Sequence, residues 1–279
     1  MAITAQDVNK LRQMTGAGMM DCKKALTEAE GDFDKAVDIL RKQGQKVAAK
    51  RADNATSEGA VLVYISDDAK SGKIVALACE TEPVSKVEDF KNLAQSILAK
   101  AVEIDAVDKD ALLAATMADG RTVSENIIDL TGKLGEKLDV IAYENLSAEE
   151  VVSYVHSNGK LGVLVGFGGV NGTDVAELGK DVAMQIAAMK PVALDKDGVD
   201  SATIEREIEV GRDQARAEGK PEAMLEKIAM GRLNKFYRDN TLLNQDFVKD
   251  GSMTIRQLLE KTAKGLEVKD FKRVAIGGV

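Results

Sequence analysis

The sequence predicts an α+β protein with an N-terminal three-helix module, a duplicated hairpin-plus-helix core and an inserted antiparallel helical hairpin. Three observations support this fold class. Helical apolar spacing fills the first 50 residues, paired β-branched runs precede an amphipathic helix at two places, and a second helical stretch interrupts the latter half. The expected units are 1–55, 56–141, 142–198 together with 240–279, and 199–239.

The composition limits the class of protein. The chain has 279 residues, of which 44% are apolar and 30% charged, as in folded proteins with real cores. A formal charge of −8 argues against broad electrostatic attraction to nucleic acid. No signal peptide and no stretch of about 18 apolar residues is visible, so we expect a cytoplasmic protein without membrane contact, or one whose targeting segment has been removed. Cys22 and Cys79 are isolated, which favours reduced thiols.

The N-terminal module begins with a helix that Thr4 can cap, with Asp7 three residues later. Thr15-Gly16-Ala17-Gly18 then turns the chain into a second helix that opens with Met19 and Met20. Adjacent helical side chains point about 100° apart, so one methionine can face the core while the other leans outward. Alternatively, both fill gaps in a small core. A third helix is expected from near Asp34.

The core shows an internal repeat. Each unit pairs two β-branched runs and continues into an amphipathic helix, over 59–66, 73–79 and 87–104 in the first half and over 151–157, 160–167 and 173–189 in the second. Tyr64-Ile65-Ser66 aligns with Tyr154-Val155-His156. We further align Gly72-Lys73-Ile74 with Gly159-Lys160-Leu161.

Residues 201–240 interrupt the second unit with two helical periodicities. Glu218-Gly219-Lys220-Pro221 joins them, with glycine suited to a helix end and proline to a helix start. We expect two antiparallel helices that protrude from the core; the alternative is that they pack flat on it. A helix over 254–264 and a strand over 268–276 return to the second half.

No catalytic constellation is visible. His156 is the only histidine and lacks a matching nucleophile motif, so it reads as a core or contact residue. No cluster has metal-ligand spacing, and we expect no cofactor. The enzymatic alternative is the glycine-rich run 166–172, which follows a strand and precedes a helix. Its spacing fails, because Asn171 occupies the place of the third glycine in a dinucleotide-binding loop.

Residues 11–26, which run from Leu11-Arg12 through Thr15-Gly16-Ala17-Gly18-Met19-Met20-Asp21-Cys22 to Leu26, resemble the opening of the bacterial elongation factor Ts family. The second hairpin, the helical hairpin and Leu243-Asn244-Gln245-Asp246-Phe247-Val248 are also similar to that family. The resemblance implies a UBA-like N-terminal module. It further implies a non-catalytic guanine nucleotide exchange factor for protein biosynthesis, which binds elongation factor Tu and promotes exchange of GDP for GTP.

The resemblance also assigns contact residues. The N-terminal module, with Arg12, Met19 and Met20, and the first core half would contact the nucleotide-binding domain of elongation factor Tu, and His156 would contact another domain. It implies no direct contact with nucleic acid, and it leaves a homodimer or a dimer of heterodimers open.

One departure lies in the segment that disturbs the partner's Mg²⁺ region in this family. Many members carry Thr-Asp-Phe-Val after the second strand, where this chain has Thr81-Glu82-Pro83-Val84. Glu82 keeps a carboxylate, whereas Pro83 replaces the aromatic wedge and removes a backbone donor. Pro83 would then either serve in a modified wedge or simply end the strand.

Overall fold

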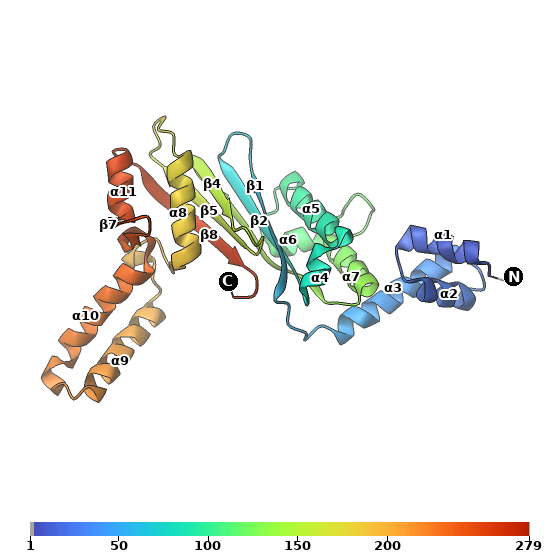
Figure 1. The fold of residues 1–279 in the computed structure, drawn as a ribbon, viewed down its shortest axis with the longest axis horizontal. Helices are drawn as coiled ribbons and strands as arrows, with labels where there is room; N and C mark the ends of the chain where they lie inside the picture. Colours follow the sequence, from blue (N-terminus) through green and yellow to red (C-terminus); the bar gives the residue numbers. More distant parts are fainter. Residues whose placement is uncertain (1–2, 279) are drawn as a thin grey trace.

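The computed structural model describes residues 3–278; Met1, Ala2 and Val279, at the outer limits of the predicted units 1–55 and 240–279, lie outside the described residues. The molecule is elongated (Figure 1). The N-terminal helices lie at one end, a helical pair projects at the other, and two sheets with their covering helices lie between them. The fold class is α+β as predicted, while the exact limits of the four units stay a prediction.

The N-terminal module contains three helices, α1 (Ala5–Thr15), α2 (Met19–Glu28) and α3 (Phe33–Lys50). Thr4 and Asp7 form the capping box that begins α1, and Gly16 ends it at a positive φ of 66°. The core of the module is small. Its buried side chains are Val8, Leu11, Cys22, Ala25, Leu26, Ala29 and Ala36.

The first core half is a three-stranded antiparallel sheet covered by helices. Its strands, in the order β1-β2-β3, are Glu58–Ile65, Ser71–Cys79 and Leu138–Ser147. Its helices are α4 (Glu82–Lys86), α5 (Glu88–Glu103), α6 (Lys109–Ala114) and α7 (Val123–Leu134). Central β2 alternates strictly, because Val75 and Leu77 face these helices while Ile74 and Ala76 face the other sheet.

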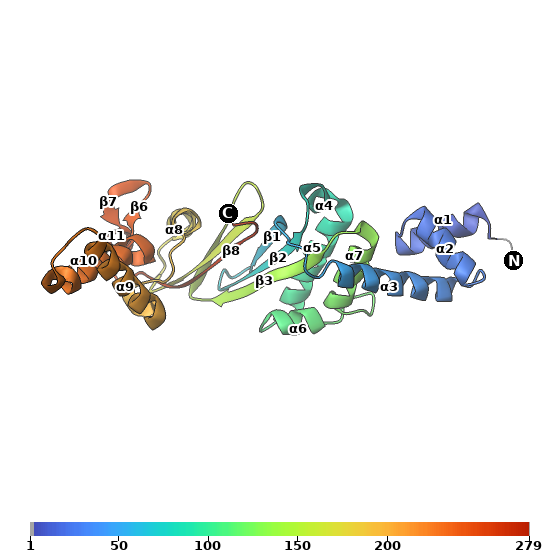
Figure 2. The same ribbon diagram turned by 90° about the horizontal axis from the view of Figure 1, so that it is seen from below.

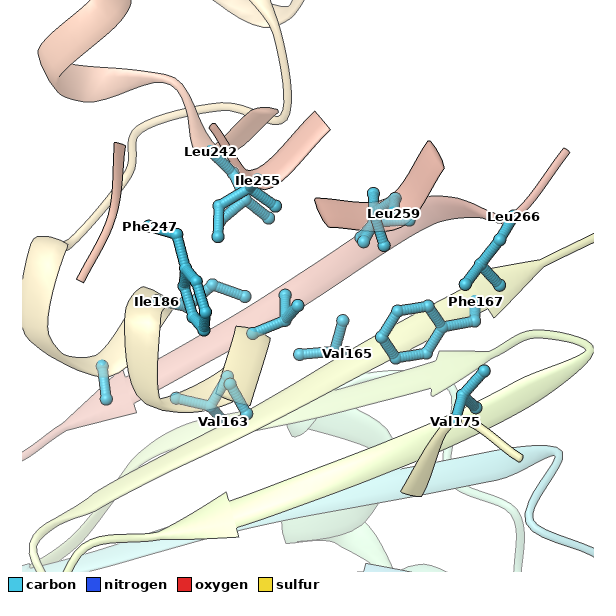
Figure 3. Close-up of a cluster of buried hydrophobic side chains, with 14 of the residues drawn as sticks. Val163, Val165, Phe167, Val175, Ile186, Leu242, Phe247, Ile255, Leu259 and Leu266 are labelled. Carbon is cyan, nitrogen blue, oxygen red and sulfur yellow. The ribbon is translucent and has the colours of Figure 1, made fainter. Parts of the chain in front are cut away.

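The second core half repeats this plan. Its strands, in the order β4-β5-β8, are Glu150–Val155, Leu161–Gly168 and Glu267–Ala275. The other elements are α8 (Ala176–Met189), α11 (Ile255–Thr262), the short hairpin β6 (Asp246–Phe247) and β7 (Asp250–Thr254), and two 3₁₀ turns, η1 (Lys196–Gly198) and η2 (Leu242–Asn244). Figure 3 shows Val163, Val165 and Phe167 of β5 meeting side chains from α8 and α11 in one buried cluster.

The inserted helices α9 (Ser201–Ala217) and α10 (Glu222–Asn240) pack on each other and project from the second half (Figure 1). They do not lie flat on the core. Their connection uses Gly219 at a φ of 73° and Pro221 as the N-cap of α10. The flanking chain segments meet at the base, where Val192 N donates to Asn240 O. The insertion therefore leaves the core through one narrow base.

The two sheets pack face to face, and their contacts at two glycines are reciprocal. A Cβ on Gly72 would lie 2.8 Å from Leu164 Cδ2, and a Cβ on Gly162 would lie 2.7 Å from Val61 Cγ1. These positions correspond in the two hairpins, since Ile65 pairs with Gly72 as Val155 pairs with Gly162. Each hairpin thus has a glycine at the place where side chains of the other hairpin pack, and a larger residue would clash with them.

Backbone hydrogen bonds join the sheets with the same reciprocity. Val61 N donates to Gly159 O at 2.8 Å, and the corresponding Val151 N donates to Ala69 O at 2.6 Å. Both sheets also carry a register shift at matching places, after Ala76 in one and after Gly166 in the other. The internal repeat is therefore a repeat of structure. In each half, the edge strand donates a backbone hydrogen bond to the hairpin turn of the other half.

The second of the two predicted alignments was wrong. Gly72 corresponds to Gly162 and not to Gly159. Gly159, at a φ of 69°, takes the place of Ala69, at a φ of 56°, in the turn of the other hairpin. The Gly-Lys identity misled the alignment, because the residue with positive φ in the first hairpin is an alanine, which carries no turn signal. The alignment of Tyr64 with Tyr154 is confirmed.

We predict that Gly162→Ala destabilises the protein by about 1–3 kcal/mol, because the stiff Val61 side chain cannot yield to the new methyl group. Urea unfolding followed by circular dichroism measures the change. Gly231→Ala in α10 is the control, since nothing lies within 4 Å of its added Cβ. Equal stability of the two variants would contradict the reciprocal contact.

Candidate partner-binding surface

The segment Thr81–Val84 forms the start of α4 and not the end of a strand. Strand β2 ends at Cys79, and Pro83 lies in the first turn of the helix, where its fixed φ and missing N–H are tolerated. Ending the strand is thus not the role of Pro83. Thr81, Glu82 and Pro83 are exposed, whereas Val84 is half-buried against the core of the first half.

The backbone at Thr81 is held by two neighbours. Thr81 N and Oγ1 donate to the Glu136 carboxylate at 3.0 and 2.7 Å, and Cys79 Sγ donates to Thr81 O at 3.2 Å. Burial, followed by the nearby charges of Glu136 and Glu58, raises the pKa of Cys79 to about 12, so the thiol keeps its proton and remains a donor. The backbone at the start of the exposed segment Thr81–Val84 is therefore held in place by these hydrogen bonds.

Glu80 connects this segment to the N-terminal module. Its carboxylate accepts from Arg51 Nη1 at 2.9 Å, from Asn54 at 3.0 Å and from Lys137 N at 2.6 Å. Desolvation opposes ionisation, but the Lys137 N–H and the Arg51 guanidinium outweigh it and hold the pKa of Glu80 below its usual range. The chain leaving α3 is thus pinned beside α4.

The N-terminal module exposes methionines. Met19 and Met20 are 52% and 75% exposed, and Met14 is 58% exposed. The prediction that at least one of Met19 and Met20 is exposed is confirmed; because both are exposed, neither faces the core, and the alternative that both fill it is wrong. Cys22, Ala25 and Leu26 already fill the side of α2 that faces the core. Arg12 is exposed as well, on α1.

His156 is exposed at the start of the turn between β4 and β5, so it is not a core residue. Its Nδ1 lies 2.8 Å from the Tyr154 hydroxyl. Beside the pair is an apolar pocket of about 390 Å³. Its lining includes Tyr154, His156, Leu161, Met184, Phe247 and Val248. Met184 and Phe247 were not predicted as site residues, because they come from elements that are distant from His156 in the chain.

In the glycine-rich run 166–172, two backbone N–H groups already face a carboxylate of the same protein. Val170 N and Asn171 N point to the Glu149 carboxylate at 3.3 and 3.4 Å. Gly169 packs so closely on Gly265 that a Cβ would lie 2.0 Å from its carbonyl oxygen. The loop is therefore a tight connection between a strand and a helix. Its N–H groups face the negative charge of Glu149, which would repel a phosphate bound at the same place.

Among residues 3–278, no group of three or more His, Cys, Asp or Glu side chains is placed to hold a metal ion. None of the described helices has the length and apolarity that crossing a membrane requires. What the described surface does present is exposed methionines, an exposed helix start and an apolar pocket, each on a fixed backbone. Exposed apolar side chains and a pocket of this kind suit contact with another protein.

Comparisons with known proteins identify the family. The profile described as Elongation factor TS matches residues 80–278. The chain is 64% identical to Elongation factor Ts of Cytophaga hutchinsonii over 98% of its own length and 99% of that relative. It is 57% identical to Elongation factor Ts of Amoebophilus asiaticus, over 99% of this chain and all of the relative. The chain belongs to the elongation factor Ts family.

We predict a pH-dependent contribution from Glu80. Because its pKa is lowered on folding, the stabilisation is complete above the unfolded pKa of about 4.3 and is lost as the pH falls through the lower folded value. Glu80→Gln should cost about 1–3 kcal/mol at pH 7, and this difference should shrink below about pH 4.

Urea unfolding at several pH values tests this. Glu82→Gln serves as the control, since the Glu82 carboxylate is exposed and makes only a 3.8 Å ion pair with Lys86. A stability difference between wild type and Glu80→Gln that grows on acidification would contradict the assignment.

Proposed function

We propose that this protein is a non-catalytic, cytoplasmic guanine nucleotide exchange factor that binds elongation factor Tu with GDP and promotes its exchange for GTP. Family membership supports the class of activity. The observation that carries the proposal is the exposed start of α4, whose base is fixed by Glu136 and Cys79 and tied through Glu80 to the N-terminal module. A rigid projection of this kind suits the task of displacing part of a partner.

The physical basis is linkage. A protein that binds the nucleotide-free state of its partner more tightly than the GDP-bound state must weaken GDP binding by the same factor. Abundant GTP then refills the site and displaces the factor. No bond is made or broken by the factor itself, so it needs no catalytic group.

Within the segment, we assign the disturbing role to Glu82 and to the backbone of residues 81–84. The Glu82 carboxylate is exposed and can approach the Mg²⁺ and phosphate region of the partner. Pro83 stiffens the first turn of α4, and half-buried Val84 anchors it in the core. Exchange then needs no aromatic ring, because a coupling of about 1–3 kcal/mol can be spread over several contacts.

The remaining contacts complete the proposed surface. Met19 and Met20 offer flexible apolar area, and Arg12 offers a charge on the neighbouring helix. We assign these three residues to the nucleotide-binding domain of the partner. His156, next to the apolar pocket, is assigned to a second domain of the partner.

The test is GDP release from elongation factor Tu of the same organism, followed with a fluorescent nucleotide. We predict fast release with wild type and release roughly 3-fold slower with Glu82→Ala, since one of several contacts is lost. Glu88→Ala is the matched control, as another exposed glutamate with a nearby lysine partner.

Pro83→Phe completes the series. A wild type as slow as no factor, together with fast release by Pro83→Phe, would mean that the aromatic wedge is indispensable and would overturn the proposed mechanism.

A further inference from the structure

Helices α3 and α7 cross at two glycines. A Cβ on Gly132 would lie only 2.4 Å from Gly44 Cα, and this neighbour is backbone that cannot rotate away. The contact is asymmetric, because a Cβ on Gly44 would lie 3.6 Å from both Gly132 Cα and Ile128 O, an ordinary van der Waals distance. The N-terminal module and the first core half therefore approach backbone to backbone at this point.

Neither glycine is required by local conformation. Both lie within helices and neither has a positive φ. Glycine is the least favourable helix residue after proline, so its presence here needs a packing reason. The crossing supplies that reason at Gly132, where any side chain would force the helices apart.

Other contacts between the module and the core flank this crossing. The turn at Gly16 lies against the end of Lys133, and Lys133 pairs with Asp89 at 2.6 Å. At the far end of α3, Arg51 pairs with Glu80. Next to the crossing the two parts separate into a groove of about 390 Å³ that Met14, Val37 and Arg121 help to line. The crossing of Gly44 and Gly132 thus lies between these flanking contacts and fixes how α3 lies against α7.

We propose that Gly132 and Gly44 are positioning residues that set the direction of the N-terminal module relative to α4. In Figure 2, α4 and the α1–α2 pair lie on the same side of the molecule, opposite α6. The crossing holds Met19 and Met20 at a fixed separation from Thr81–Val84, so that both surfaces meet one partner at once. This inference rests on the proposed exchange function.

The energetic argument is preorganisation. Two contacts held in the correct geometry bind together with a high effective concentration, whereas a misaligned pair forfeits that advantage without losing any contact residue. A change at the crossing should therefore act on the concentration of factor needed for exchange and leave the rate at saturation nearly intact.

Three variants separate position from stability. Gly132→Ala introduces the 2.4 Å clash. Gly44→Leu presses on α7 from the module side and leaves the sequence of the core untouched. Gly44→Ala is the matched control, since its methyl group fits at 3.6 Å. Melting curves for all three verify that each variant is folded.

The direction of the module is measured without any partner. Spin labels on Lys23→Cys and Asp110→Cys report a distance by pulsed electron resonance, and the native Cys22 and Cys79 are fully buried and stay unlabelled. We expect a shifted or broadened distance distribution for Gly132→Ala and Gly44→Leu and an unchanged one for Gly44→Ala.

Exchange is then measured with elongation factor Tu carrying a fluorescent GDP. Gly132→Ala and Gly44→Leu should raise the half-maximal factor concentration at least roughly tenfold, with a similar maximal rate. Unchanged distances in both variants, or changed distances with an unchanged half-maximal concentration, would overturn the inference.

A wild type that fails to accelerate GDP release would overturn the proposed function, and with it the role of the crossing in exchange. The distance measurement would still report whether the crossing fixes the module, so the two failures are distinguishable.

Discussion

The rest of the structure depends on the reciprocal packing of the two sheets. Side chains of the second hairpin pack against Gly72, and side chains of the first hairpin pack against Gly162. In addition, Val61 N and Val151 N each donate a hydrogen bond to the turn of the opposite hairpin. Each central strand is buried on both faces, because helices cover the outer face and the partner sheet covers the inner face. Neither half could bury its inner face alone, so the repeat is a single structural unit.

This frame fixes the proposed contact residues through short connections. Thr81–Val84 follows β2 after a single intervening residue, Glu80, and His156 follows β4 directly. The Glu80 carboxylate also accepts a hydrogen bond from Arg51, the residue that follows α3. The proposed contact surfaces are thereby parts of one frame rather than loops on separate domains. A rigid frame suits the proposed exchange function, because any yielding of the frame would reduce the interaction energy available to change the partner's shape.

Sequence reasoning predicted several elements whose apolar spacing is long and regular, such as α5, α8 and both hairpins, but it did not predict α7. It did not predict α4, because five residues are too few for a helical period to be visible. Strand β3 was also missed, since Asp139, Glu144 and Asn145 interrupt its apolar pattern and its pairing with β2 exists only in the folded chain. The exposure of both Met19 and Met20 follows from how little core the three-helix module has. The pocket beside His156 could not be predicted, because Met184 and Phe247 reach it only through the tertiary fold.

The most direct test of the account is hydrogen–deuterium exchange of the full chain with and without elongation factor Tu and GDP. If one rigid frame presents all the contacts, then peptides covering residues 12–20, 81–86 and 154–160 should gain protection together at the same partner concentration. The β2 and β5 peptides should be strongly protected in both states, because they are the fully buried centres of the two sheets. Protection confined to one of the three regions, or an opening of β2 and β5 on binding, would contradict the account.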